Sequence, residues 1–235
     1  MDASHVTLGL ATLAFVGGHL VLSSGPVRGR LVGLIGEGPF RGLYSILAAG
    51  TLVWMVESYR FALDTRLWTV GAFGPPILYV SMFLASIFLA CSLTPSNPTL
   101  AGLDDVPPAA TSAYGIFAVA RHPMLVSFAL WSGAHLVVRG DVAGLIFFGG
   151  FFVLAILGMI HIDARQRASA VGAAAAGWAA FEAATSRTPF LALIQGRARV
   201  RLKELGPARL VAGVLLFVVM LFAHGPVIGL YLTPP

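Results

Sequence analysis

Six long apolar segments dominate this sequence, and they restrict the fold to helices that can cross a membrane. They are Val6–Ser23, Leu43–Tyr59, Pro76–Leu93, Met124–Val138, Val142–Ile160 and Leu210–Leu230. A hydrocarbon core about 30 Å thick is crossed by about 20 helical residues. Hydrophobic residues form 57% of the 235 residues and charged residues only 11%, which excludes a water-soluble domain. We therefore predict an all-α, polytopic membrane helical bundle of about six transmembrane helices, built as a single domain over residues 1–235.

Arginine-rich connections between the spans indicate the orientation. Gly25–Arg41 and Ile162–Arg209 hold most of the basic residues, and positively charged loops stay on the cytoplasmic side of a membrane. Both termini are then expected outside, and the proline-containing, turn-rich connection 94–120 inside. The net charge of +5 predicts contact with membrane lipid headgroups and no nucleic acid partner, because no base-reading motif is present. The alanine-rich segment Ala164–Ser186 predicts an interfacial helix after the fifth span.

Two histidines, His19 and His135, lie inside predicted spans. An ionisable side chain is costly to bury in a membrane, so it is expected to face the bundle interior and to mark a functional site. Helical spacing places Phe15 on the face of His19, and Trp131 on the face of His135. An aromatic face that carries a histidine could line a flat cofactor. The alternative is core packing, in which each imidazole donates to a carbonyl of the next helix.

The depths of these two histidines in the membrane permit a shared metal ion without requiring one. At a rise of about 1.5 Å per residue, His19 lies roughly 8 Å from the cytoplasmic end of its span and His135 roughly 17 Å from that side. The offset is about 9 Å. Two imidazoles on one iron hold their backbones roughly 12 Å apart, given metal–nitrogen bonds of about 2 Å.

The sequence Arg121-His122-Pro123 is the sharpest local motif, because proline fits the first turn of a helix and marks where the fourth span begins. Arg121 and His122 are then expected at the cytoplasmic mouth of the bundle. Arginine suits a carboxylate or phosphate of a ligand or a lipid, and the alternative is a side chain that reaches the headgroups. His122 lies about 20 Å along the helix from His135, so these two cannot bind one metal ion.

The other chemically active side chains rank lower. The single Cys91 is expected to be a buried, inert thiol. His5 is terminal, His161 ends an apolar run, and His224 is the best reserve ligand. No phosphate-binding loop, nucleophile elbow or carboxylate pair stands out, so the sequence identifies no catalytic residue.

Several motifs together resemble the NnrU family of bacterial membrane proteins. They are G-H-L-V-L-S-S at Gly18–Ser24, G-E-G-P-F-R-G-L-Y-S at Gly36–Ser45, L-W at Leu67-Trp68, R-H-P-M at Arg121–Met124, W-S-G-A-H-L at Trp131–Leu136, R-T-P-F-L-A-L-I-Q-G-R at Arg187–Arg197 and F-A-H at Phe222–His224. The resemblance implies a bacterial cytoplasmic membrane and a link to nitrite and nitric-oxide (denitrification) metabolism. The same landmarks are similar to those of 15-cis-zeta-carotene isomerase, which uses haem b with histidine ligands. This implies that His19 and His135 ligate haem iron here, with Phe15 and Trp131 beside the cofactor.

A second resemblance points to methyl transfer. Arg121-His122-Pro123, a helical hairpin and then Thr188-Pro189-Phe190 resemble isoprenylcysteine carboxyl methyltransferases, but their paired glutamates are replaced by the sequence around Asp163. Three hypotheses remain open. The chain is a haem-binding protein of nitrogen-oxide or redox metabolism, a haem-dependent cis–trans isomerase of an apolar polyene, or a methyltransferase that uses S-adenosylmethionine.

Overall fold

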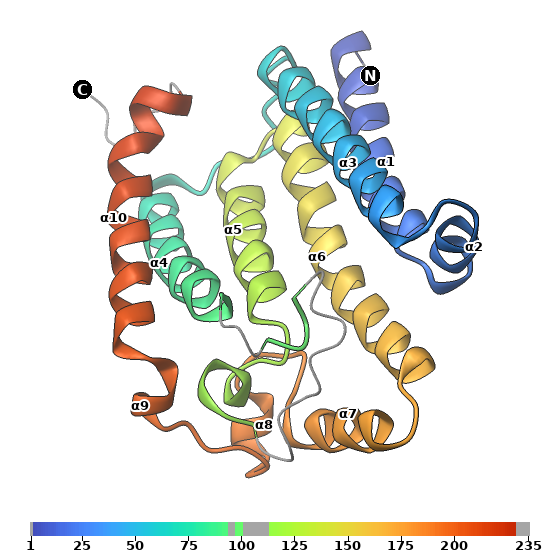
Figure 1. Cartoon of the computed structure of the whole chain (residues 1–235). Coiled ribbons are helices and arrows are strands. Elements are labelled where there is room, and N and C mark those ends of the chain that lie inside the picture. The colour runs from blue at the N-terminus through green and yellow to red at the C-terminus, as the bar shows by residue number, and fades with distance from the viewer. Residues whose placement is uncertain (1, 94–96, 101–112, 229–235) are drawn as a thin grey trace. The chain divides into compact units, whose positions relative to one another are not determined.

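The computed structural model describes residues 2–93, 97–100 and 113–228, with side chains up to residue 224. Its elements are α1 Ala3–Leu22, α2 Gly25–Ile35, α3 Glu37–Arg60, η1 Gly71–Phe73, α4 Gly74–Ser92, η2 Gly115–Ala118, α5 Pro123–Arg139, α6 Val142–Ser169, α7 Ala173–Ala184, α8 Leu191–Ile194, α9 Leu202–Leu205 and α10 Pro207–Ile228 (Figure 1). Over these residues there is no β-strand, only an isolated bridge between Arg66 and Asp141. The all-α prediction is confirmed.

Five helical segments of the described chain are long and apolar enough to cross a membrane. They are Ala3–Leu22, Glu37–Arg60, Gly71–Ser92, Val142–Ser169 and Pro207–His224. Each corresponds to a predicted span, so the prediction of a membrane helical bundle is confirmed. The remaining predicted span, Met124–Val138, is helix α5 of 17 residues, which is near the lower limit of about 17 residues for a membrane-spanning helix. The last two residues of Leu210–Leu230 and most of connection 94–120 lie outside the described residues.

Two predicted connections differ in detail from the structure. Gly25–Arg41, expected as a loop, contains α2 and the first turn of α3. Glu37 starts α3 six residues before the predicted span, where its carboxylate favours a helix N-terminus and pairs with Arg28 at 2.6 Å and Arg41 at 2.8 Å. Ala164–Ser186 is not one helix. Helix α6 continues to Ser169, and Gly172, with a positive φ of 59°, interrupts the helical backbone before α7.

The chain forms two compact units. Unit 1 comprises Met1–Gly71 and Ser132–His161, and unit 2 comprises Ala72–Trp131 and Ile162–Pro235, so α5 and α6 contribute residues to both. The single-domain organisation stays a prediction.

In unit 1, α1 packs along α3, and the chain after α3 closes over the turn between α5 and α6. The Gly140 carbonyl accepts from the backbone nitrogens of Leu67 at 2.7 Å and Trp68 at 3.0 Å. The Trp68 indole donates to the carbonyl of Val137 at 2.8 Å. Gly140 has φ 60°, and a Cβ there would meet the carbonyl oxygen of Trp68, so this position requires glycine. These bonds fix the part of α5 that carries His135.

Gly150 of α6 lets α1 approach closely. A Cβ at residue 150 would collide with the Thr12 methyl group, whereas one at Gly149 would only touch Leu136 at 3.5 Å. Gly150→Ala is therefore expected to lower the free energy of unfolding by about 1–3 kcal/mol through overpacking. Gly149→Ala should be neutral or slightly stabilising, because alanine favours a helix by about 1 kcal/mol over glycine. Chemical unfolding in detergent compares the two variants, and equal effects would contradict the close approach.

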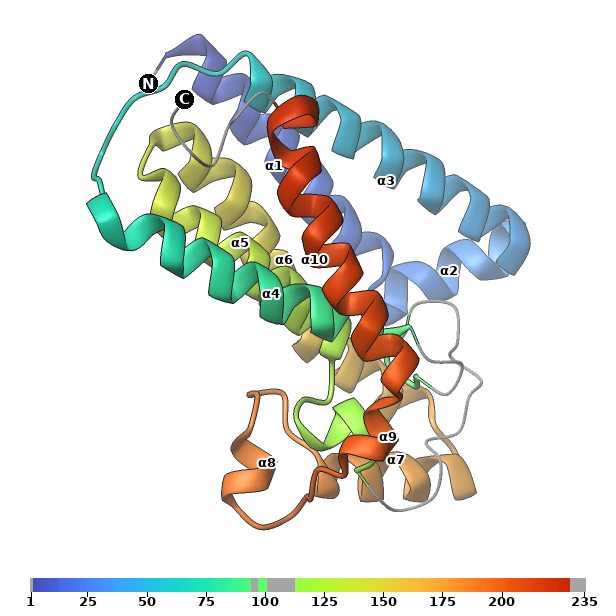
Figure 2. The ribbon, with the colours of Figure 1, turned by 90° about the vertical axis from the view of Figure 1, so that its left-hand side faces the viewer.

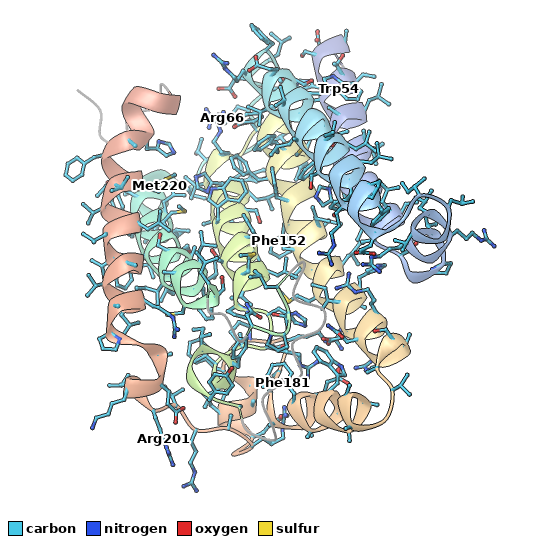
Figure 3. All side chains as sticks on the ribbon, viewed as in Figure 1. Trp54, Arg66, Phe152, Phe181, Arg201 and Met220 are labelled. Carbon is cyan, nitrogen blue, oxygen red and sulfur yellow. The ribbon has the colours of Figure 1, made fainter. Side chains whose placement is uncertain are left out.

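In unit 2, α4 and α10 lie side by side (Figures 1 and 2). A Cβ at Gly213 of α10 would stand 2.9 Å from the Ile87 Cα, so this glycine sets the close approach. Ser127 of α5 donates to the Ala85 carbonyl of α4 at 2.7 Å. Away from these spans, Phe181 of α7, labelled in Figure 3, packs its ring 5.7 Å from that of Phe117.

Candidate functional site

His19 stands near the end of α1, half-buried, with its tautomer fixed by its own helix. Its Nδ1 lies 2.8 Å from the carbonyl oxygen of Phe15. Because a carbonyl oxygen only accepts, Nδ1 is the donor, and in the neutral imidazole Nε2 then carries the lone pair. No hydrogen bond of the described chain uses Nε2. The neighbouring rings are Phe15 at 4.4 Å and Tyr44 of α3 at 5.5 Å between centroids. His19 therefore presents a lone pair beside an aromatic surface.

His135 of α5 is also half-buried and lies against an aromatic ring. Its imidazole stacks on Phe148 of α6, with centroids 4.8 Å apart and an interplanar angle of 24°. An unbroken row of rings joins it to His19. The row runs His19, Phe15, Phe151, Phe147, Phe148, His135, with successive centroid distances of 4.4, 5.3, 5.3, 5.1 and 4.8 Å. The two predicted ligands thus border one aromatic cluster inside unit 1.

Contacts to α6 give the relative depth of the two histidines. A Cβ at Gly150 would meet Thr12 and Val16 of α1, and a Cβ at Gly133 of α5 would lie 3.3 Å from Phe152, labelled in Figure 3. Since α5 is antiparallel to α6, His135 is level with Gly150, and therefore with the residues of α1 midway between Thr12 and Val16. His19 lies five residues further along α1. At about 1.5 Å per residue the offset is about 8 Å.

A second polar cluster lies in unit 2, around Arg121. All five N–H donors of this guanidinium are used within the chain. Nε donates to Thr185 Oγ1 at 2.9 Å, Nη1 to Asp163 at 2.5 Å and Glu182 at 3.0 Å, and Nη2 to the carbonyls of Glu182 at 2.9 Å and Thr185 at 3.4 Å. Arg121 is 7% exposed and Asp163 1% exposed. This geometry is a buried ion-pair network that ties the chain before α5 to α6 and α7.

His122 completes the network. Its Nε2 lies 2.8 Å from Oδ1 of Asp163, and the Nε of Arg187 lies 3.3 Å from Oδ2 of the same carboxylate. Burial lowers the pKa of His122 by more than the hydrogen bond to Asp163 raises it, so the imidazole is neutral near pH 7 and donates Nε2–H to the carboxylate. Its buried Nδ1 has no hydrogen-bond partner. Over the described residues, no cluster of three or more His, Cys, Asp or Glu side chains could hold a metal ion.

Comparison with known proteins identifies the family. A family model described as NnrU protein matches residues 7–232, which is nearly the whole chain. The chain belongs to the NnrU family. No curated protein and no solved structure matches it.

In this NnrU protein, the predicted site residues divide between the two units. Phe15, His19 and His135 belong to the aromatic cluster of unit 1. Trp131 is the last residue of the α5 segment assigned to unit 2, one turn before His135, and its contact with a cofactor stays a prediction. Arg121 and His122 were expected at the cytoplasmic mouth of the bundle, and both side chains are buried and bonded to the chain. Asp163 and Glu182 pair with Arg121 at 2.5 Å and 3.0 Å, and contact of Arg121 with a lipid headgroup stays a prediction.

Sequence reasoning missed most of the partners. Phe147, Phe148 and Phe151 were assigned only to an apolar span, although F-F-G-G-F-F at residues 147–152 was a visible signal of rings beside a close helix contact. Asp163 was noted only as a departure from a methyltransferase pattern. Its role as the anion of the Arg121 network depends on a contact between residues 42 positions apart, which no local spacing reveals.

Proposed function

We propose that this NnrU-family protein binds haem b between His19 and His135 in a bacterial cytoplasmic membrane and serves nitrogen-oxide or redox metabolism. The observation that carries the proposal is the hydrogen bond from His19 Nδ1 to the Phe15 carbonyl. Histidines that ligate metals commonly donate their other ring nitrogen to a carbonyl or carboxylate, which fixes the ring and directs the lone pair. His19 has this arrangement before any metal is bound.

The depth of the two imidazoles also fits the proposal. With an axial offset of about 8 Å, backbones roughly 12 Å apart require a lateral separation of about 9 Å between the two histidine backbones. Since each backbone lies about 2.3 Å from its helix axis, the axes of α1 and α5 would then stand about 14 Å apart, wider than two directly packed helices. Both α1 and α5 pack against the same stretch of α6. The row of phenylalanine rings between the imidazoles supplies apolar surface of the kind that a porphyrin face contacts. Phe15 and Phe148, which lie against the imidazoles, would turn aside to admit the ring.

A haem held by two histidines would supply one-electron chemistry, and it would bind nitric oxide at the iron position that either histidine leaves. The chain's own contribution is to hold the imidazole of His19 in one tautomer, to surround both ligands with aromatic side chains and to keep water away. We prefer this function to methyl transfer because Arg121 has no donor left for the carboxylate of a methyl donor. Turnover of a 15-cis polyene by the reduced protein would assign isomerase activity to the same site.

Haem occupancy tests the proposed function. The protein, produced with a haem precursor and purified in mild detergent, should show a Soret band and the pyridine haemochrome of haem b. The double variant His19→Ala/His135→Ala should lose the band, because both ligands are gone. His5→Ala/His161→Ala is the matched control with two histidines removed from the same unit, and it should retain the cofactor. A folded wild-type protein that stays colourless and takes up no added haemin would refute the proposal, as would loss of haem from the control alone.

A further inference from the structure

Thr12 of α1 carries a buried hydroxyl group without a hydrogen-bond partner. The residue is 8% exposed, and its Oγ1 has no hydrogen-bond partner. Other threonines in these helices behave differently: Thr7 donates to the carbonyl of Ala3 at 3.0 Å, and Thr51 to that of Leu47 at 2.7 Å. An unsatisfied buried hydroxyl is unfavourable, and native proteins rarely retain one without a reason.

The packing of its methyl group explains why Thr12 does not bond to its own helix. The Thr12 Cγ2 occupies the space that a side chain at Gly150 would fill, next to Met55 and Val16. Because threonine is stiff about χ1, placing the methyl group there fixes the direction of the hydroxyl group. The pair of Thr12 and Gly150 therefore holds an unused hydrogen-bond donor in a defined position.

That position borders the proposed cofactor site. Thr12 precedes His19 by seven residues, so the two side chains share a face of α1, about 10 Å apart along the axis. Phe15, which touches His19, lies between them on this face. The register through Gly150 also places Thr12 within two residues of the depth of His135. The hydroxyl group is thus far from the His19 end of the site and level with its His135 end.

We propose that, once the His135 imidazole has left the iron, the Thr12 hydroxyl donates a hydrogen bond to the outer atom of a small neutral molecule, nitric oxide or carbon monoxide, that takes its place. This inference rests on the proposed function, because the small molecule needs the haem iron to hold it. Thr12 acts as a positioning residue. Its donor favours a ligand that carries partial negative charge on its outer atom.

Carbon monoxide is the probe for this inference. In the His135→Gly background, which opens the iron position, the C–O stretching frequency of the reduced protein should rise when Thr12→Val is added, because the hydrogen bond that draws charge onto the ligand is lost. Thr12→Ser should keep the frequency closer to that of the His135→Gly parent. An unchanged frequency in Thr12→Val, with the Soret band retained, overturns the role of Thr12 and leaves haem binding intact. Absence of haem from the wild-type protein overturns both.

A second measurement needs no cofactor. In the haem-free protein, Thr12→Val should keep or raise the melting temperature, because it replaces an unsatisfied hydroxyl group with a methyl group and keeps the contact with Gly150. Thr12→Ser should lower the melting temperature, because it removes that contact. A lower melting temperature in Thr12→Val than in Thr12→Ser would show that the hydroxyl already serves a protein partner, and it would overturn the inference.

Discussion

Asp163→Asn is expected to lower the free energy of unfolding by about 3–5 kcal/mol, the cost of breaking a buried ion pair from one side. Asp163 is 1% exposed. Its carboxylate oxygens lie 2.5 Å from a nitrogen of Arg121, 2.8 Å from one of His122 and 3.3 Å from one of Arg187. Without the carboxylate charge, the buried guanidinium of Arg121 keeps only Glu182 as an anionic partner. Chemical unfolding in mild detergent measures the change.

The control for this substitution is an ion pair of the same type at the surface. Glu57 of α3 contacts Arg60 at 3.0 Å, and both side chains are well exposed. Glu57→Gln should cost about 1 kcal/mol or less, since water screens such pairs. A loss from Asp163→Asn as small as that from Glu57→Gln would mean that water reaches the Arg121 network and that the network does not anchor the chain before α5.

Replacement of either proposed ligand by glycine is expected to convert a low-spin haem to a high-spin haem. His19→Gly and His135→Gly each remove one imidazole and leave room for a small molecule. Affinity for haem should fall at least as far as the roughly 10–100-fold that follows loss of a second-shell partner. Added imidazole should restore the low-spin absorption spectrum in both variants, because it re-enters the space that the side chain left.

His161→Gly is the control that separates loss of a haem ligand from a general effect of removing a histidine from this unit. His161 lies in the same unit, on the face of α6 that carries Gly150 three turns earlier, and its buried Nε2 has no hydrogen-bond partner. Its replacement should leave the spectrum unchanged. If added imidazole restored a low-spin spectrum in His161→Gly and did not change the spectrum of His135→Gly, the two haem ligands would be His19 and His161.

Much of the fold could be predicted from the sequence because a membrane allows few solutions. Segments of about 20 apolar residues can only be helices when lipid satisfies no backbone group. The helical form of Gly25–Arg41 could not be read in this way, since α2 has no buried residue and its hydrophobic pattern is weak. The break before α7 depends on the positive φ of Gly172, one glycine among 27.

The sequence predicts those site residues whose ionisable side chains are energetically costly to bury in a membrane. His19 and His135 could be identified because each is an ionisable group in an apolar run. Thr12 and Gly150 could not be paired from the sequence. Their contact joins two helices that lie far apart along the chain, and it depends on the register of α1 against α6. Arg121 and His122 were identified, but their burial reflects Asp163, whose position is set by tertiary structure.

Electron paramagnetic resonance of the ferric protein tests most directly whether two histidines ligate one haem. The wild-type protein and His161→Gly should each give a single low-spin signal typical of two imidazole ligands. His19→Gly and His135→Gly should each give a high-spin signal. A high-spin signal in the wild-type protein, or a low-spin signal that survives both ligand substitutions, would contradict shared axial ligation by His19 and His135.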